Sequence, residues 1–362
     1  MVPELRARPA TSALIGVCLV VFVVVWIAAI VRADEPAMAA LRMGWTFDDA
    51  PLLEGVGALA AVRVWLDGEW WRVLSAGLLH GSWLHVALNM LGLWAVGQWT
   101  EKAWGGWRQL ALFSVASVGG CLASLAWAEA PLVVGASAGI FGVAGALVVA
   151  RAWGCERVRQ AVEPVSARTL GFWLAFWLGV GALLPWIFGV SLLAQAGHLG
   201  GLFFGVIAGG ALSLAPERRS FKALLWSGVV LGLVGLASAA QEPSWRPNYH
   251  AFSGSELLER EEFEAAAAHF DQALLMAPDD PVLANAVAYS LAEAAVDLER
   301  AEALVLRSLD AQPDNADYLD TLGWVLCQQG RVDEGRAVLE AAQEAADRDI
   351  PEIAAHLEAC GT

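Results

Sequence analysis

Gly135-Ala136-Ser137-Ala138-Gly139 is the stretch that decides the fold, because it places a serine inside a long apolar segment. The surrounding residues, Leu132–Ala150, are almost all Val, Ala, Gly, Leu, Ile and Phe. A G-x-S-x-G motif is typical of a nucleophilic serine on the strand–turn–helix of soluble hydrolases. Here the long apolar run indicates a helix in lipid instead. Polar groups are costly in lipid, so this serine points to a function.

The same apolar character recurs along the chain, which is 57% hydrophobic with a mean hydropathy of +0.53. Seven segments are long enough to span a bilayer: 12–32, 73–98, 109–128, 132–150, 169–188, 192–215 and 223–240. The first is long for the apolar part of a signal peptide, and no clear small-residue cleavage site precedes Glu35. We therefore expect an all-α, polytopic membrane bundle.

Lysines and arginines fall on alternate loops between these segments, which fixes an expected orientation. Basic residues precede segment 12–32 and occupy the loops before 109–128, 169–188 and 223–240. The intervening loops 129–131 and 189–191 carry no basic residue, and the outer loop 33–72 is rich in Trp and acidic residues. The pattern predicts a cytoplasmic N-terminus and an extracytoplasmic C-terminal part.

Charge separates the chain into two parts. Residues 1–240 carry 15 Lys and Arg against 13 Asp and Glu, whereas residues 241–362 carry 7 against 25. The acidic part argues against binding nucleic acid or anionic lipid through that region. Five cysteines show no C-x-x-C spacing, so no metal site is expected. Cys327 and Cys360 are able to pair, but the sequence alone does not establish a bond.

The acidic part has an internal period of about 35 residues. Gly254, Ala266, Phe270, Ala273 and Pro278 stand at the offsets of a tetratricopeptide repeat (TPR). The same register continues from Tyr289 and from Gly323, giving about three helix–turn–helix units. We therefore predict an α-helical, TPR-like repeat domain, and a plain array of helical hairpins is the simpler alternative.

Histidines and an asparagine in other apolar segments complete a candidate site. His198 lies in segment 192–215, and His80, His85 and Asn89 lie in 73–98. The expected orientation puts all of them, with Ser137, early in spans that enter from the outer face. Taken singly, such residues are more often packing or crosslinking groups in membrane helices. Their common depth favours a joint function.

The predicted chemistry is hydrolysis by a Ser–His dyad. A serine hydroxyl needs a base, and His198 is the candidate. No acid lies in segments 132–150 or 192–215, so a triad is not expected. Phe141, one helical turn after Ser137, is expected to pack against His198. The Ser137 backbone N–H, His85 and Asn89 are candidates for the oxyanion site, and His80 for facing the water cavity or orienting a loop.

Close approach of two helices is needed to bring Ser137 to His198. Segment 192–215 carries Gly201 and Gly205 at a G-x-x-x-G spacing, and segment 132–150 carries Gly135 and three further glycines. Small residues at this spacing allow membrane helix backbones to pack closely. We expect the two segments to pack together through these glycines.

These motifs resemble the rhomboid family of intramembrane serine proteases over roughly residues 60–215. The similar motifs are Trp70-Trp71-Arg72, His80-x4-His85-x3-Asn89, Gly97-x3-Glu101-x3-Gly105, Gly135-x-Ser137 and His198-x2-Gly201-x3-Gly205. One departure is Ala138, where many members have Gly. Several spaced motifs in the family's order make the resemblance specific.

The resemblance implies Ser137 as nucleophile, His198 as base, His85 and Asn89 as oxyanion ligands, and Trp71 and Arg72 as structural residues of the outer loop. It implies membrane-anchored protein substrates, cut in or near a transmembrane segment, and no cofactor or metal. Some bacterial members also carry a seventh helix and a C-terminal repeat domain, so a bacterial inner membrane is the expected location.

The domain organisation expected is therefore 1–11 as cytoplasmic N-terminus, 12–215 as a six-helix protease core, 216–240 as loop and seventh helix, and 241–362 as the repeat domain, which would recruit substrates or an adaptor. The main alternative is a catalytically silent, rhomboid-like scaffold that binds membrane proteins. A soluble α/β-hydrolase is disfavoured because the order Ser…Asp…His is missing, and a transporter because no inverted repeat is evident.

Overall fold

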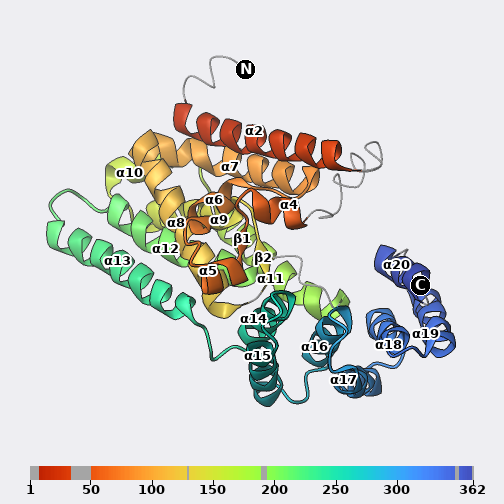
Figure 1. Ribbon diagram of the computed structural model, residues 1–362. Coiled ribbons are helices and arrows are strands. Elements are labelled where there is room, and N and C mark those ends of the chain that lie inside the picture. Colours follow the sequence, from red (N-terminus) through yellow and green to blue (C-terminus); the bar gives the residue numbers. More distant parts are fainter. Residues whose placement is uncertain (1–7, 34–49, 129, 189–193, 347–349, 361–362) are drawn as a thin grey trace. The chain divides into compact units, whose positions relative to one another are not determined.

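The computed structural model describes residues 8–33, 50–128, 130–188, 194–346 and 350–360. It separates into two compact units, Met1–Pro243 and Ser244–Thr362 (Figure 1). The expected cytoplasmic residues 1–7, residues 34–49 of the outer loop and the loop 189–191 lie outside the described residues. The two units are described separately below.

Over the described residues, the first unit contains seven long helices, one for each apolar segment of the sequence. They are α2 (Pro9–Arg32), α7 (Trp83–Trp104), α8 (Gly106–Trp127), α9 (Ser137–Trp153), α11 (Ala167–Phe188), α12 (Gln195–Ser213) and α13 (Arg219–Gln241). Short elements connect them: α4 (Ala50–Gly55), β1 (Leu59–Ala60), α5 (Ala61–Asp67), α6 (Arg72–Ser75), the 3₁₀ turn Ala76–Leu78, β2 (Leu132–Val133) and α10 (Glu156–Ala161).

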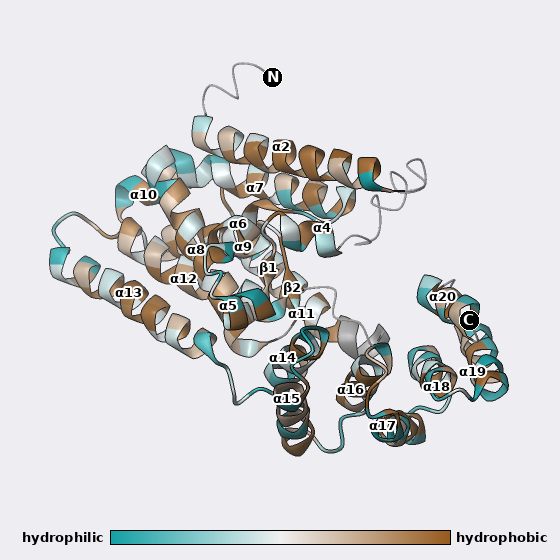
Figure 2. Cartoon of the chain, in the orientation of Figure 1, coloured by the Kyte–Doolittle hydropathy of each residue, from teal (hydrophilic) through white to brown (hydrophobic). Residues whose placement is uncertain are grey.

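Four of the described helices, α2, α8, α12 and α13, are long and apolar enough to cross a membrane. Helices α9 and α11 are apolar but shorter over their described lengths. Helix α7 is long but less apolar, since it carries His85, Asn89 and Gln98. Figure 2 shows the hydrophobic residues that run along α2 and α13. The expectation of a polytopic helical bundle is confirmed at this level.

Among the helix starts, two differ most from the expectation. Helix α7 begins at Trp83 rather than at residue 73, and α9 begins at Ser137 rather than at residue 132. The first difference arises because residues 72–78 form two short helical turns of their own. The second arises because β2 pairs with β1 (Leu59 opposite Val133) before the chain turns at Gly135, whose φ is +124°. His80 is therefore in a connecting segment, and Ser137 is the first residue of its helix.

The centre of this unit is a three-helix packing of α8, α9 and α12. Helix α13 packs against α8 and α12, α11 packs mainly against α9, and α2 packs mainly against α7 (Figure 1). Glu101 of α7 accepts hydrogen bonds from the backbone N–H groups of Ala10 (2.9 Å) and Thr11 (3.0 Å). A carboxylate at the free N–H groups of a helix start is favourable, so this contact secures α2.

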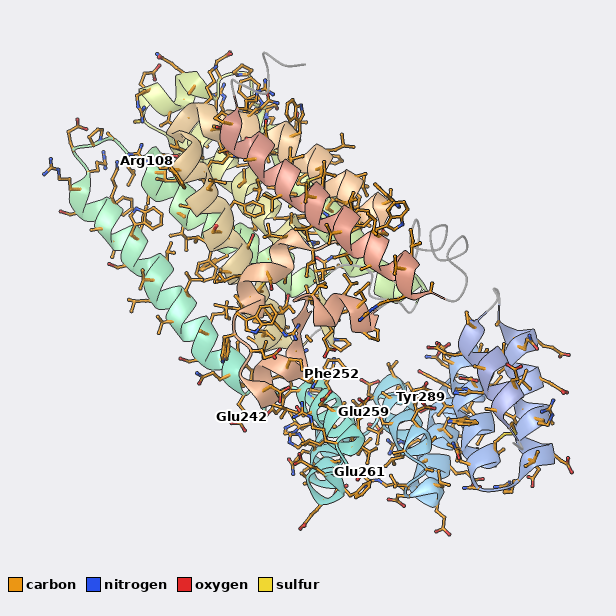
Figure 3. All side chains as sticks on the ribbon, turned by 45° about the horizontal axis from the view of Figure 1, so that its top comes forward. Arg108, Glu242, Phe252, Glu259, Glu261 and Tyr289 are labelled. Atoms are coloured by element: carbon orange, nitrogen blue, oxygen red, sulfur yellow. A yellow bond between two sulfur atoms is a disulfide. The ribbon has the colours of Figure 1, made fainter. Side chains whose placement is uncertain are left out.

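The described part of the second unit contains seven helices: α14 (Pro247–Glu259), α15 (Phe263–Met276), α16 (Pro281–Glu293), α17 (Leu298–Ala311), α18 (Ala316–Gln328), α19 (Val332–Ala345) and α20 (Pro351–Ala359). The first six pack as three consecutive hairpins, and the first helices of successive hairpins also contact each other. Asp280 and Asn315 cap α16 and α18. Figure 3 shows Glu259 and Glu261 at the end of α14, and Tyr289 on α16.

A disulfide joins α18 to the chain end. Cys327 and Cys360 are bonded, with their Cα atoms 5.4 Å apart. The sequence left this pairing open. In the same region, His356 of α20 is hydrogen-bonded through Nδ1 to Asp320 Oδ1 at 2.9 Å and stacks on Trp324 with ring centroids 4.6 Å apart. The last helix is thus held to α18 by a covalent bond and by a buried polar contact.

Candidate active site

Ser137 stands at the N-terminus of α9, directly after a tight turn. The N–H of Gly135 donates to the carbonyl of Ala76 at 3.0 Å, which fixes the turn. The N–H groups of the first helical turn have no partner within the helix. In the part of the chain that the structure describes, the Ser137 N–H has no recorded acceptor. The side chain and its own N–H therefore lie at the positive end of a helix dipole.

His198 faces this serine from α12. Its Nε2 lies 2.9 Å from Ser137 Oγ, which is hydrogen-bonding distance. The imidazole is 4% exposed, and its Nδ1 has no hydrogen-bond partner among the described residues. The ring of Phe141 stacks on it with centroids 4.4 Å apart and planes 3° from parallel. Trp173 of α11 packs in turn against Phe141 at 5.5 Å.

Glycines allow α9 and α12 to approach this closely. A Cβ added to Gly201 would overlap the carbonyl oxygen of Ala138, and one added to Gly205 would overlap the backbone of Gly142. Gly120 of α8 faces the Ala138 methyl group in the same way. The extra methyl at position 138 is thus accommodated by a glycine on a neighbouring helix. Both helix backbones come together as the G-x-x-x-G spacing predicts.

A cavity of about 70 Å³ opens beside the serine. It is lined by Ala76, His85, Gly120, Cys121, Ser124, Val133, Val134, Gly135, Ser137, Ala138, Ala194, Gly197 and His198. About 10–15 Å³ of this kind of volume holds one water, so the cavity has room for a few waters next to Ser137 and His198. Access of water to this pair is a requirement for hydrolysis.

His85 lines this cavity, whereas Asn89 does not. A Cβ placed on Gly135 would lie 2.8 Å from His85 Nε2 and 3.8 Å from Ser137 Oγ, so His85 reaches the neighbourhood of the serine. The side-chain amide of Asn89, 7% exposed, donates to the carbonyl of His85 at 2.9 Å within its own helix. An oxyanion contact from Asn89 would require this amide to turn, or to use its second N–H.

His80 supports the turn before the serine rather than facing the cavity. Its Nε2 accepts a long hydrogen bond of 3.5 Å from the N–H of Ala136, and its ring lies 5.1 Å from that of His85. The side chain is 1% exposed. Of the two roles considered from the sequence, the geometry fits orientation of a loop.

Arg72 and Trp71 lie away from the serine and organise the segment between α4 and α6. The Arg72 guanidinium, in a residue 5% exposed, binds Glu69 Oε2 at 2.6 Å and the carbonyls of Glu54 and Ala58. It also lies over the exposed Trp71 ring at 4.8 Å. One guanidinium thus satisfies several groups of the segment between α4 and α6, a structural use that its donors suit.

Two cavity residues had no signal in the sequence. Ser124 of α8 has a buried hydroxyl without a hydrogen-bond partner among the described residues, and it lines the cavity near His198. The carbonyl of Ala76 holds Gly135. Ser124 lies within a run of small residues, and a backbone carbonyl carries no sequence identity, so neither was identifiable before the helices were placed.

Comparison with known proteins finds a similar family for part of this unit. Residues 67–215 match the rhomboid domain. The chain is 35% identical over 165 residues to the rhomboid protease GluP of Bacillus subtilis. This alignment covers 46% of this chain and 30% of that protein. It is 31% identical over 185 residues to the rhomboid-like protease 5 of Toxoplasma gondii. This alignment covers 49% of this chain and 20% of that protein.

A third relative is the rhomboid protease GlpG of Photorhabdus laumondii, 31% identical over 154 residues, covering 42% of this chain and 50% of that protein. The chain spans between a fifth and a half of the length of these relatives. Each alignment is shorter than the first unit of this chain, 243 residues long. The likeness is thus limited to part of each protein.

Proposed function

We propose that the rhomboid domain of this chain is an intramembrane serine endopeptidase that hydrolyses peptide bonds in or near transmembrane segments of membrane-anchored proteins. The observation that carries the proposal is the 2.9 Å contact between His198 Nε2 and Ser137 Oγ in a unit with membrane-competent helices. The names of the relatives, which are rhomboid proteases, support the same activity.

In the proposed reaction Ser137 Oγ attacks the substrate carbonyl carbon while its proton passes to His198 Nε2. The C–N bond then breaks, and the proton moves from His198 to the leaving amine. A cavity water attacks the acyl-enzyme with His198 again as base, and Ser137 recovers its proton. His198 acts without a carboxylate partner, so its positive charge in the intermediate is supported by the face of Phe141.

The oxyanion of the tetrahedral intermediate would be held by the Ser137 N–H, by His85 and by Asn89. Preorganised donors at this position commonly supply the largest share of such a rate enhancement. The helix dipole of α9 contributes in the same direction. Asn89 does not line the cavity, and it would take part only after its amide turns or through its second N–H.

For the C-terminal unit we propose a TPR-like stack on the extracytoplasmic side. Ser255 and Ser290, 35 residues apart, are hydrogen-bonded through their hydroxyls at 2.7 Å, as equivalent positions in adjacent repeats would be. The Cys327–Cys360 disulfide supports an oxidising compartment, in agreement with the distribution of basic loops. Such stacks form concave surfaces for peptides, so the unit would recruit a substrate or an adaptor protein.

The deciding experiment is cleavage of a reporter with one labile transmembrane segment in proteoliposomes, comparing the unaltered chain with Ser137→Ala. Ser117→Ala is the matched control, because Ser117 is also a buried serine near α9 but does not line the cavity. Loss of cleavage only in Ser137→Ala is expected. Equal cleavage by both variants would contradict the assigned nucleophile.

If no variant cleaves the reporter, a serine-directed fluorophosphonate distinguishes an unsuitable substrate from a silent scaffold. Labelling of the unaltered chain but not of Ser137→Ala would support the proposed protease activity. Absence of labelling would favour the scaffold. Recruitment is tested separately by removing residues 244–362: unchanged cleavage of every natural substrate would contradict that role.

A further inference from the structure

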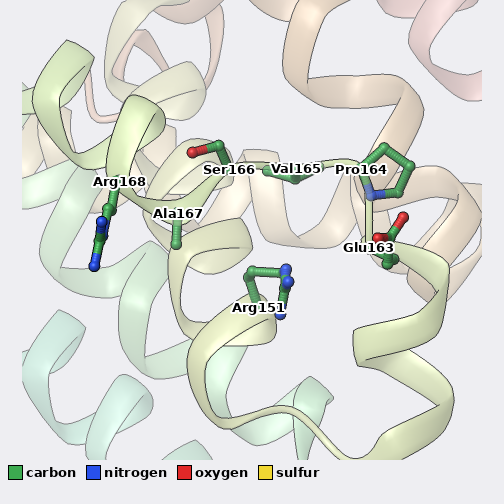
Figure 4. A pocket seen from close by; sticks show the side chains of 7 residues that line it. All are labelled: Arg151, Glu163, Pro164, Val165, Ser166, Ala167 and Arg168. Carbon is green, nitrogen blue, oxygen red and sulfur yellow. The ribbon is translucent and has the colours of Figure 1, made fainter.

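A second, larger cavity lies at the opposite end of α9 from Ser137. It has a volume of about 410 Å³ and is lined by Arg151, Glu163, Pro164, Val165, Ser166, Ala167 and Arg168 (Figure 4). At about 1.5 Å per residue, Arg151 is roughly 21 Å along the helix from Ser137. The cavity is therefore separate from the proposed catalytic site.

Two guanidinium groups on this cavity form no ion pair with the residues that the structure describes. Arg151 comes from the last turn of α9 and Arg168 from the first turn of α11. Neither side chain makes an ion pair or hydrogen bond with a residue that the structure describes, whereas the nearby Arg159 is paired with Glu156 at 2.5 Å. Two arginines and one carboxylate, Glu163, on the same cavity leave a net positive charge that suits an anion such as phosphate.

The start of α11 adds uncharged donors to the same wall. Ser166 caps the helix, accepting from the N–H and the hydroxyl of Thr169 at 3.2 and 2.9 Å, which leaves its own proton to donate. The N–H groups of Ala167 and Arg168 have no recorded acceptor in the described chain. The cavity thus combines two side-chain cations with neutral donors on a second helix.

The cavity lies at a level where lipid headgroups are expected. Trp153, two residues after Arg151, is 76% exposed, and Trp107 at the start of α8 is 85% exposed. Exposed tryptophans at helix ends are typical of the membrane–water interface. The basic loops place this interface on the cytoplasmic side, where anionic lipids attract arginines.

From these observations we infer that the cavity between α9 and α11 binds a phosphate group, with Arg151 and Arg168 as its charged ligands. The phosphate belongs to an anionic lipid headgroup or to a soluble phosphate ester, which offer the same chemistry here. Bound phosphate would bridge the end of α9 to the start of α11. Glu163 on the rim opposes the anion, so its carboxylate limits the affinity.

The test uses the full chain in a neutral detergent and follows the melting temperature during titration with short-chain phosphatidylglycerol, phosphatidylcholine with the same acyl chains, glycerol 3-phosphate and inorganic phosphate. Stabilisation by phosphatidylglycerol over phosphatidylcholine is expected. Arg151→Gln with Arg168→Gln should weaken the apparent affinity at least tenfold, while Glu163→Gln should strengthen it about threefold. If the double variant does not fold, the affinity is measured with Arg168→Gln alone, because Arg168 is at an exposed position.

The matched control is Arg218→Gln with Arg219→Gln, which removes the same charge from another basic loop of the same side. Equal weakening by this control would show general attraction to basic loops and overturn the site. Unchanged affinity in Arg151→Gln with Arg168→Gln would also overturn the site. The absence of stabilisation by all four probes would do the same. If glycerol 3-phosphate stabilises as well as phosphatidylglycerol, the ligand is a soluble phosphate ester, and if it does not, the ligand is a lipid.

Discussion

The ring of Phe141 lies flat on the ring of His198, with centroids 4.4 Å apart and an interplanar angle of 3°. Phe141 is one turn beyond Ser137 on α9, so the helix that presents the serine also holds the histidine in place. His198 Nδ1 has no hydrogen-bond partner among the described residues. We propose that this stacking orients His198, the role that a hydrogen bond to Nδ1 has in a triad.

Replacing Phe141 by leucine is therefore expected to lower kcat while KM changes little. Aromatic stacking contributes about 1 kcal/mol beyond the buried area, which corresponds to a rate loss of roughly fivefold. Steady-state cleavage in proteoliposomes measures both constants. Phe172→Leu is the control, because Phe172 is 73% exposed on α11. A rise in KM with unchanged kcat in Phe141→Leu would contradict a role in positioning His198.

The contact between α9 and α12 predicts a sharp difference between two glycines of α12. A Cβ at Gly205 would overlap the Gly142 backbone, whereas one at Gly210 would meet only side-chain atoms, at 3.7 Å and beyond. Overpacking of this kind costs about 1–3 kcal/mol, and it would also separate His198 from Ser137. Gly205→Ala should melt at a lower temperature in detergent and lose most of its cleavage, and Gly210→Ala should do neither. Equal behaviour of the two variants would show that the helices are not in this contact.

The C-terminal helix α20 should loosen as pH rises. Burial opposes protonation of His356, but its hydrogen bond to Asp320 and the charges of Asp320 and Glu293 outweigh burial, so its pKa is raised. A raised pKa means that the stabilisation is complete below the unfolded value, about 6.5, and is lost as pH rises through the folded value. Hydrogen exchange of residues 350–360, corrected for intrinsic rates, should therefore accelerate above neutral pH.

In His356→Gln this pH dependence should disappear, because glutamine does not titrate. The neighbouring aromatic rings of Trp324 and Tyr289 carry no charge in this range and leave the sign unchanged. Exchange that slows with rising pH in the unaltered chain would be incompatible with the contact between His356 and Asp320.

Loss of the Cys327–Cys360 disulfide should destabilise α18–α20 more than the rest of the second unit. The bond closes a loop across a sequence separation of 33 residues, for which chain entropy gives about 3–4 kcal/mol. Cys327→Ser with Cys360→Ser should thus be cleaved faster by limited proteolysis in this region. The free Cys155, replaced by Ser, is the control. Unchanged protection in the double variant would mean that noncovalent contacts hold α20 alone.

The approximate helices and their order followed from sequence because apolar length and polarity are local properties. The start of α9 did not, since Leu132 and Val133 are as apolar as the helix they precede. Their pairing with β1, some seventy residues earlier, decides that the helix begins at Ser137. The same holds for His80, whose place before α7 depends on the short turns at 72–78.

By itself the sequence indicated candidate residues for the proposed chemistry, because Ser137, His198 and His85 are costly polar groups in apolar segments. It also determined the close-packing face, through the glycine spacing of α12. Only the tertiary structure decided which groups meet. It directs the Asn89 amide to the carbonyl of His85 and brings Ser124 into the cavity beside Ser137. It also places Arg151 and Arg168 on one cavity, where neither forms an ion pair with a described residue. The reason is physical: composition and period act along one helix, whereas hydrogen bonds and charge compensation depend on the neighbours that packing supplies.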